Sequence, residues 1–227
     1  RMPACGASFA ALRFRGVCFG YADGTRVLDG FDVEVRAGEF VAVTGPSGVG
    51  KSTTLMLALG MEDPSEGAVE VEFAGSGGEG AVVEAIVAAD LAPGTFAYVP
   101  QGNMLMSGTV RDAVTLTDCD GEGGSALDES LYAACALEFV DTLPQGVDTP
   151  LGEHGSGLSE GQMQRLAVAR AVYSGAPVLL LDECTSALDE TTEHEMLDRL
   201  RALGRTVIIV THRPAALSIC DRAISLG

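Results

Sequence analysis

Residues 45–53 of this chain read Gly-Pro-Ser-Gly-Val-Gly-Lys-Ser-Thr, and this segment limits the possible folds more than any other. The pattern Gly-x4-Gly-Lys-Ser is that of a phosphate-binding P-loop. Its glycines let the backbone curl until successive N–H groups point inward at an oxyanion. The apolar run 40–44 before it predicts a buried parallel strand, and the spacing of residues 51–59 predicts a helix whose N-terminal end adds positive potential. The segment therefore predicts a strand–loop–helix unit of an α/β protein.

Lys51 is the only lysine in the chain, and the other thirteen basic side chains are arginines. An ammonium is a compact point charge that fits between β- and γ-phosphates, whereas the wide guanidinium fork does not. The alternative is that the composition of the chain is biased against lysine and that Lys51 remains by chance. The complete motif surrounds this residue, which disfavours that alternative. We expect nucleotide phosphates to be held by Gly45, Pro46, Ser47, Gly48, Val49, Gly50, Lys51, Ser52 and Thr53.

The overall composition excludes several classes of partner. The net charge of −18 predicts a surface that repels nucleic acid and anionic lipid headgroups, so no nucleic-acid partner is expected. The six cysteines form no CxxC pair, which indicates reduced thiols of a cytosolic protein. No apolar run approaches the ~18 to 20 residues of a membrane span. The chain opens on Arg1 rather than Met, so it could be an excised fragment.

Hydrophobic periodicity predicts strands that alternate with helices, which favours a parallel α/β core. Strands are predicted at 12–19, 31–35, 40–44, 69–73, 95–99, 178–181, 206–211 and near 223–226. Helices are predicted at 51–59, 127–137, 159–173 and 191–203. Residues 75–80 and 118–125 are expected to be loops, and 81–91 fit either a helix or a strand.

Two adjacent carboxylates, Asp182 and Glu183, follow the apolar run 178–181. Because adjacent side chains on a strand point in different directions, Asp182 is expected to face a Mg²⁺ ion and Glu183 the attacking water. The metal would neutralise phosphate charge, and the second carboxylate would orient or deprotonate the water. The alternative is a strand that ends in a solvated acidic turn.

Residues 158–162, Leu-Ser-Glu-Gly-Gln, lie upstream of this strand. With this segment in that position, the chain resembles the nucleotide-binding domain of ATP-binding cassette (ABC) transporters, whose signature there is Leu-Ser-Gly-Gly-Gln. Ser159 can cap a helix, and the backbone N–H groups with Ser159, Gly161 and Gln162 can hold a γ-phosphate. The resemblance implies that this phosphate belongs to ATP on a second copy, in a head-to-tail dimer. An ordinary helix cap is the alternative.

Further positions match the family one by one. Tyr21 lies where an aromatic ring stacks on adenine, although it could be a core residue at a strand edge. Gln101 matches the glutamine that touches Mg²⁺ or water and senses the membrane subunit; a solvated loop amide is the alternative. Asp189 matches a loop that crosses between the two sites, and it could also cap the next helix. His212 matches a histidine near the γ-phosphate.

The resemblance also implies the fold class and the surroundings of the chain. It implies an α/β P-loop NTPase (RecA-like) with a parallel-sheet core over about 1–102 and 159–227, an N-terminal antiparallel β subdomain, and an α-helical subdomain over about 103–158. Residues 108–112 and 143–155 look like those of exporters, in which Glu153 would contact a coupling helix of the transmembrane domain. The expected location is the cytoplasmic face of the cell membrane.

Glu160 departs from the family, which has glycine there. A carboxylate that pointed at a γ-phosphate would repel it. We expect Glu160 to point outward as a second-turn helix residue, where the helix dipole favours an acidic side chain, so that activity is retained. His154 and His194 are expected to be exposed to solvent.

The sequence thus predicts a Mg²⁺-dependent ATPase that drives an exporter, with ATP and Mg²⁺ as cofactors. The expected catalytic residues are Lys51, Glu183 and His212, and the expected metal ligands are Ser52, Gln101 and Asp182. Three alternatives stay open: the ATPase subunit of an importer, a DNA-maintenance or translation ATPase of the same superfamily, and a regulatory nucleotide-binding module without turnover. The absence of coiled coils, tandem cassettes and basic surfaces disfavours the second.

Overall fold

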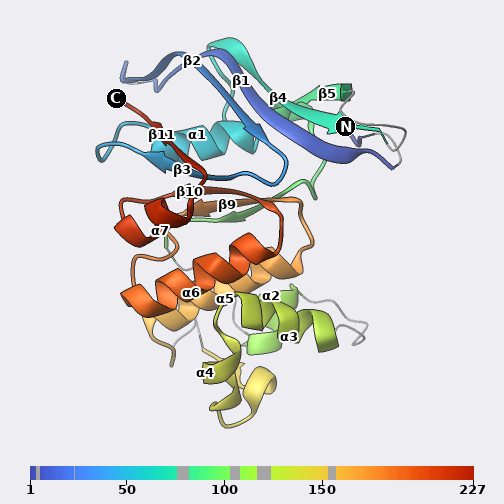
Figure 1. The fold of residues 1–227 in the computed structure, drawn as a ribbon, viewed down its shortest axis with the longest axis vertical. Helices are drawn as coiled ribbons and strands as arrows, with labels where there is room; N and C mark the ends of the chain where they lie inside the picture. The colour runs from blue at the N-terminus through green and yellow to red at the C-terminus, as the bar shows by residue number, and fades with distance from the viewer. Residues whose placement is uncertain (4–5, 23, 76–81, 103–107, 117–123, 153–156) are drawn as a thin grey trace.

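The computed structural model describes the chain except for residues 4–5, 23, 76–81, 103–107, 117–123 and 153–156. Figure 1 shows three layers: a sheet near the N-terminus at the top, a second sheet with one helix across the middle, and a group of helices below. Among the described residues, no helix is long and apolar enough to cross a membrane.

The upper sheet is antiparallel and has the strand order β2-β1-β4-β5. Its strands are β1 (Ser8–Gly20), β2 (Arg26–Arg36), β4 (Glu66–Ala74) and β5 (Val82–Val87). The three alternating segments of the sequence all lie in this sheet. The ambiguous segment 81–91 contains β5 and a short 3-10 turn over Ala88–Asp90. The predicted loop at 75–80 falls almost entirely outside the described residues.

The central sheet is parallel, with the order β11-β3-β10-β9-β6. Its strands are β3 (Phe40–Thr44), β6 (Phe96–Val99), β9 (Val178–Asp182), β10 (Thr206–Val210) and β11 (Arg222–Ser225). Every residue of β9 and β10 is buried, as expected for strands covered on both faces. Because the strands are parallel, their carboxyl ends meet at one edge, where the predicted site residues follow them.

The two faces of the central sheet support two hydrophobic clusters. Val43 and Ile208 pack with helix α1 (Lys51–Ala58) and the antiparallel sheet. Ala42 and Ile209 pack with helices α5 (Glu160–Tyr173) and α6 (Glu190–Ala202) on the other face. Figure 1 shows α1 above the sheet and α5 with α6 below it.

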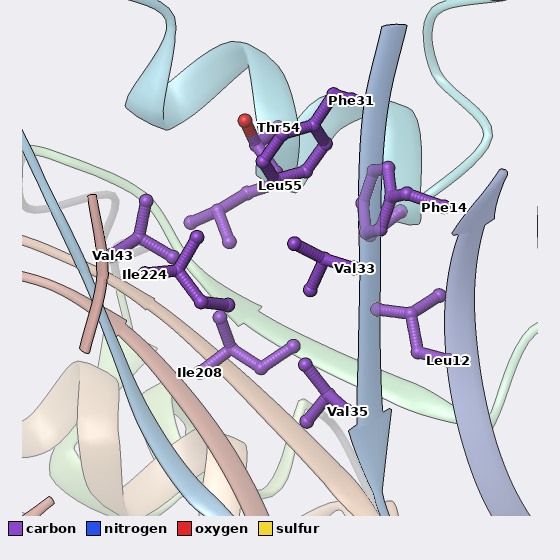
Figure 2. Close-up of a pocket in the computed structure, with 11 residues that line it drawn as sticks. Leu12, Phe14, Phe31, Val33, Val35, Val43, Thr54, Leu55, Ile208 and Ile224 are labelled. Atoms are coloured by element: carbon purple, nitrogen blue, oxygen red, sulfur yellow. The ribbon is translucent and has the colours of Figure 1, made fainter. Parts of the chain in front are cut away.

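A small cavity remains where α1 and the antiparallel sheet meet the central sheet. Figure 2 shows apolar side chains from both sheets and from α1 pointing toward one another around it, among them Leu12, Val33, Leu55 and Ile208. Its volume is about 10 Å³, which is about the room that one water needs. The lining is almost wholly apolar, so the cavity belongs to the core and is not a ligand site.

Further helices lie below the sheet with α5 and α6, and the first two of them pack on α5. They are α2 (Val110–Thr115), α3 (Gly124–Ala133) and α4 (Leu137–Asp141), with the short strands β7 (Gly108–Thr109) and β8 (Pro150–Leu151) and a 3-10 turn at Gly146–Asp148. Most of the predicted loop at 118–125 lies outside the described residues, but Gly124 and Ser125 already belong to α3.

The single helix predicted over 127–137 is wrong. The helix α3 ends at Ala133, and Cys135 adopts a left-handed conformation with a φ of 53°. The Ala136 N–H then donates to the Leu131 carbonyl and the Cys135 N–H to that of Tyr132, which is the pattern of a Schellman C-cap. The apolar pattern continues across this break, so periodicity alone did not reveal it.

A second difference concerns α7 (Pro214–Ile219), which was not predicted. Residues 211–213 separate it from the end of β10, and Pro214 occupies the first turn of the helix, where a proline needs no hydrogen-bonding N–H. The other predicted helices and strands agree with the structure to within a few residues. The described cysteines Cys18, Cys135, Cys184 and Cys220 are free thiols, as the sequence indicated.

Candidate functional site

The P-loop runs from the end of β3 to the start of α1. Gly45, Gly48 and Gly50 all have positive φ, at 143°, 80° and 108°. A Cβ on Gly45 would lie 2.4 Å from the Leu226 carbonyl oxygen, and one on Gly50 would lie 2.1 Å from the Val27 Cγ1. Glycine is therefore required at both positions by backbone conformation and by lack of space.

Lys51 begins α1 and is 6% exposed. Its Nζ donates hydrogen bonds to the carbonyl oxygens of Gly45 (2.9 Å) and Pro46 (2.8 Å), so the ammonium lies inside the loop. No side chain caps the helix, whose N-cap is Gly50. The first N–H groups of α1 and the Lys51 ammonium thus provide positive potential at one place, as anion binding requires.

Asp182 ends β9 beside this loop and is 2% exposed. Its Oδ2 accepts a 3.4 Å hydrogen bond from the Tyr98 hydroxyl. Burial raises the pKa of Asp182 above its usual value, and the nearby Ser52 and Tyr98 hydroxyls oppose this rise. Burial also raises the pKa of Tyr98 to about 12, so this hydroxyl stays a donor at neutral pH.

The Asp182 carboxylate leaves one oxygen without a partner. Among the described residues no donor reaches its buried Oδ1. A buried carboxylate oxygen of this kind is costly unless something satisfies it, and a hard cation such as Mg²⁺ takes oxygen ligands. The Ser52 hydroxyl and Asp182 fit a magnesium ion that keeps waters and substrate oxygens as its other ligands. Within the described part of the chain, no cluster of three or more His, Cys, Asp or Glu side chains could hold a metal alone.

Glu183 follows the strand with a φ of 49°, in the left-handed region that side chains rarely adopt. Its Oε2 accepts a 2.8 Å hydrogen bond from the Gln101 Nε2, and its Oε1 lies 3.8 Å from the His212 Nε2. The two carboxylates contact different groups because β9 ends at Asp182 and a backbone turn, not the expected strand alternation, redirects Glu183. That Asp182 faces Mg²⁺ and Glu183 the attacking water stays a prediction.

Tyr21 lies just after β1, with its ring edge-on to Phe19 at a centroid distance of 5.2 Å. Its hydroxyl shares a 2.8 Å hydrogen bond with the Thr53 Oγ1, which places the ring over the first turn of α1. The side chain is 46% exposed, so one face of the ring is open to a ligand beside the P-loop. The alternative of a core residue at a strand edge does not fit this exposure.

The segment 159–162 forms the start of α5. The Ser159 Oγ accepts from the Gln162 N–H at 3.2 Å, and the Gln162 Oε1 accepts from the Ser159 N–H at 2.9 Å, so the two residues form a capping box. A Cβ on Gly161 would lie 2.9 Å from the Ala187 carbonyl oxygen. Glycine therefore allows α5 to pack closely on the loop that follows Glu183.

The structure does not bring this segment to the P-loop of the same chain. The two helices α1 and α5 lie on opposite faces of the central sheet (Figure 1). Asp189 caps α6, and its carboxylate accepts from the Thr192 N–H (3.0 Å) and hydroxyl (2.7 Å), as the sequence suggested. The backbone N–H and the hydroxyl of Thr192 also lower the pKa of Asp189.

Glu160 is exposed at the start of α5 and belongs to its first turn rather than the second. That its carboxylate points away from a γ-phosphate on another copy stays a prediction. His194 is exposed and lies 3.5 Å from Asp198, as expected of a solvated histidine. His154 and Glu153 lie outside the described residues.

Sequence reasoning missed several residues that contact the site. Tyr98 is the clearest of these missed residues. The signal that could have identified it is a tyrosine in the short apolar strand that precedes Gln101. Gln164, Glu193 and Arg213 form polar contacts behind the site that no short motif indicates.

Comparisons with known proteins agree with this geometry. A family model described as "ABC transporter" matches residues 28–186. The chain is 40% identical over 220 residues to an ATP-dependent lipid A-core flippase of Ralstonia nicotianae, covering 95% of this chain and 36% of that protein. It is 38% identical over 222 residues to the mycobactin import ATP-binding/permease protein IrtB of Mycobacterium bovis, covering 96% and 37%.

A solved structure of a bacterial Atm1-family ABC exporter with ATP bound superposes with a TM-score of 0.84 at 34% identity, covering 99% of this chain and 38% of that one. The chain therefore spans a little over a third of the length of the proteins it matches.

Proposed function

The chain belongs to the ABC transporter family, and from this membership we propose that it is the motor domain that binds and hydrolyses ATP to drive an exporter. The observation that carries the proposal is the convergence of the P-loop, Asp182, Glu183, Gln101 and His212 at one edge of the parallel sheet. A phosphate cradle, a buried carboxylate and a second carboxylate near a histidine are what phosphoryl transfer to water requires.

In the proposed mechanism the P-loop and Lys51 bind the phosphates, and Tyr21 stacks on the adenine. The Lys51 ammonium exchanges its bonds to the Gly45 and Pro46 carbonyls for phosphate oxygens. Ser52, Asp182 and Gln101 would hold Mg²⁺, which supplies charge neutralisation at the β- and γ-phosphates.

Glu183 is the proposed base or water positioner. The Gln101 amide and His212 lie at its two carboxylate oxygens, so the direction of the carboxylate is set before the substrate arrives. His212 would stabilise the γ-phosphate, and the carboxylate would take or orient the proton of the attacking water.

A second copy of the domain completes the proposed site. Because α5 and the P-loop are on opposite faces of the sheet, Ser159, Gly161 and Gln162 can reach a γ-phosphate only on another subunit. Asp189, at the start of α6, would lie near the crossing between the two sites. Two domains packed head to tail would therefore enclose two ATP molecules.

The membrane partner is also part of the proposal. This chain covers 36% and 38% of two matched proteins, which leaves room in them for a membrane domain. We place the chain at the cytoplasmic face of a membrane, with its helical subdomain at about 103–158 near that partner. Import remains a second candidate because one relative is named as an importer, and transport measured in sealed vesicles would decide the direction.

The proposed function is tested by ATP hydrolysis in the purified full-length protein. We expect Mg²⁺-dependent release of phosphate, which chelation of the metal abolishes. Lys51→Ala and Lys51→Arg should each weaken ATP binding by ~10-fold or more, because the first removes the charge and the second replaces it with a fork too wide for a side chain only 6% exposed. Met61→Ala, at an exposed residue just past α1, is the matched control.

A wild-type protein that hydrolyses no ATP would contradict the proposal. Wild-type activity in Lys51→Ala would contradict the assignment of the phosphate cradle.

A further inference from the structure

A buried carboxylate lies behind the candidate site, on the side of the sheet that carries α5 and α6. Glu193, in the first turn of α6, is 0% exposed. Its Oε1 accepts a 2.6 Å hydrogen bond from the Thr185 hydroxyl, and its Oε2 lies 3.0 Å from the Arg213 Nε. Fully buried carboxylates are rare and are usually paired, so the burial of Glu193 needs a structural or functional explanation.

Arg213 extends these contacts to the loop that follows Glu183. Its Nη1 donates to the carbonyl oxygens of Thr185 (2.6 Å) and Leu188 (2.8 Å), while its Nε lies beside Glu193. One guanidinium therefore holds both ends of the turn between Glu183 and Asp189. A lysine could not make this set of contacts, because its single ammonium lacks the planar fork.

Arg213 is next in the sequence to a candidate catalytic residue. Arg213 follows His212 directly, and its own N–H donates to the Thr211 hydroxyl at 3.0 Å. Thr185 lies two residues after Glu183. The guanidinium and Glu193 thus connect the segment that carries the histidine to the segment that carries the carboxylate.

A third segment joins from α5. The Gln164 Nε2 donates to the Ser186 hydroxyl at 2.8 Å, and its Oε1 accepts from the Ala187 N–H at 3.0 Å. Gln164 is 5% exposed and lies one turn after Gly161. The turn 185–188 is therefore held by hydrogen bonds from α5 and from the segment after β10, and Glu193 of α6 holds it through Thr185.

We propose that Arg213 and Glu193 are positioning residues, which hold His212 and the turn 185–188 in the arrangement that Glu183 needs for turnover. The inference rests on the proposed function. The two residues touch no substrate; they act by fixing the distance between His212 and Glu183 and the path of the loop toward Asp189. Small displacements of catalytic groups reduce rates strongly, by as much as ~100-fold for about 1 Å.

The test separates positioning from stability by removing both charges together. Replacing a buried ion pair with apolar side chains is often neutral for folding, whereas removing one partner leaves an unpaired buried charge. In the full-length protein, Arg213→Met with Glu193→Leu leaves no unpaired buried charge, so this double variant should unfold at a higher temperature than Arg213→Met alone. It should lower kcat by ~10- to 100-fold while the Kd for ATP changes by less than about 2-fold.

A second measurement does not depend on ATP hydrolysis. Amide hydrogen exchange of residues 184–189 should become faster in the double variant, with little change in the strands of the central sheet. The matched control is Arg111→Met with Asp148→Leu, which removes a solvent-exposed pair of the same 3.0 Å length. It should leave kcat and the exchange of 184–189 unchanged.

Arg213→Lys covers the case in which the double variant does not fold. It keeps the charge beside Glu193 but loses the fork, so kcat should again fall with ATP affinity retained. Wild-type kcat in an active, folded double variant, or in Arg213→Lys, would overturn the inference. If the wild-type protein itself hydrolyses no ATP, that result contradicts the proposed function. The exchange of 184–189 then still tests the inference, and unchanged exchange in the double variant would contradict the positioning role of Arg213 and Glu193.

Discussion

The side-chain amide of Gln101 donates a 2.8 Å hydrogen bond to Glu183, a residue 82 positions later in the chain. The bond joins the ends of β6 and β9, which are neighbours in the parallel sheet. The His212 Nε2 lies 3.8 Å from the other carboxylate oxygen, beyond hydrogen-bond distance, so the bond from Gln101 sets the direction of Glu183. A candidate base that already points in a fixed direction is a mark of a preorganised site.

Glu183→Gln should keep ATP binding and lower turnover. The amide has almost the same shape and can still accept a bond from Gln101, but it cannot take a proton. General acid–base groups contribute about 10²- to 10⁴-fold, so kcat should fall by ~100-fold or more. ATP affinity and phosphate release should both be measured, with the exposed Glu195→Gln as the control. Near wild-type hydrolysis would refute the role of Glu183.

Gly161→Ala should disturb the contact between α5 and the loop after Glu183. The added methyl group would lie 2.9 Å from the Ala187 carbonyl oxygen and 3.2 Å from the Leu188 Cδ2. Overpacking of this kind costs about 1–3 kcal/mol, and ATPase activity should fall because the helix end moves. The control is Gly124→Ala in α3, which has no atom within 4 Å of the new methyl group and should be neutral or slightly stabilising. Urea unfolding of both variants gives the comparison.

Asp221→Asn should destabilise the fold in a pH-dependent way. The Asp221 Oδ2 accepts from the Phe40 N–H at 2.8 Å, and Arg201 also contacts the carboxylate; both lower the pKa of Asp221. A carboxyl whose folded pKa is lowered stabilises the protein fully above its unfolded pKa of about 3.9 and loses that contribution as pH falls through the folded value.

The wild type should therefore be more stable than Asp221→Asn at neutral pH, and the two stabilities should converge on acidification below about pH 4. The difference at neutral pH should shrink with added salt, because the pair with Arg201 is partly exposed. Equal stability of the two proteins at neutral pH and low salt would contradict this account.

Cys184 should resist alkylation although it follows Glu183 directly. It is 2% exposed, and burial raises the pKa of its thiol to about 12. Burial likewise raises the pKa of Cys220 to about 11. Both thiols should stay protonated at pH 8, where the reactive thiolate would be scarce. Peptide mapping after maleimide treatment should find them unmodified in the folded protein and modified after denaturation. Rapid labelling of Cys184 without unfolding would show that the loop opens.

Local patterns in the sequence predicted most of the elements correctly. The apolar runs that became β3, β9 and β10 were readable because strands buried on both faces need continuous hydrophobic residues. The break at Cys135 was missed because apolar residues continue across it, and α7 was missed because six residues carry too little periodicity. Glu160 was assigned to the second turn, although the helix predicted over 159–173 already puts it in the first turn, where the structure has it.

The sequence by itself determined the chemistry of this protein: a glycine-rich loop with one lysine, a buried strand that ends in two carboxylates, and a capped helix before it. Each of these features depends on residue types at short spacing, and such spacing fixes the local backbone structure directly.

Only the tertiary structure decided which of these groups meet. The strand order β3-β10-β9-β6 brings Gln101 and His212 to Glu183, and it leaves Ser159 on the opposite face from Lys51. The buried contact of Arg213 with Glu193 arises in the same way. Such contacts join residues distant in sequence, and they form because whole faces of the sheet must be buried, a condition that no single segment contains.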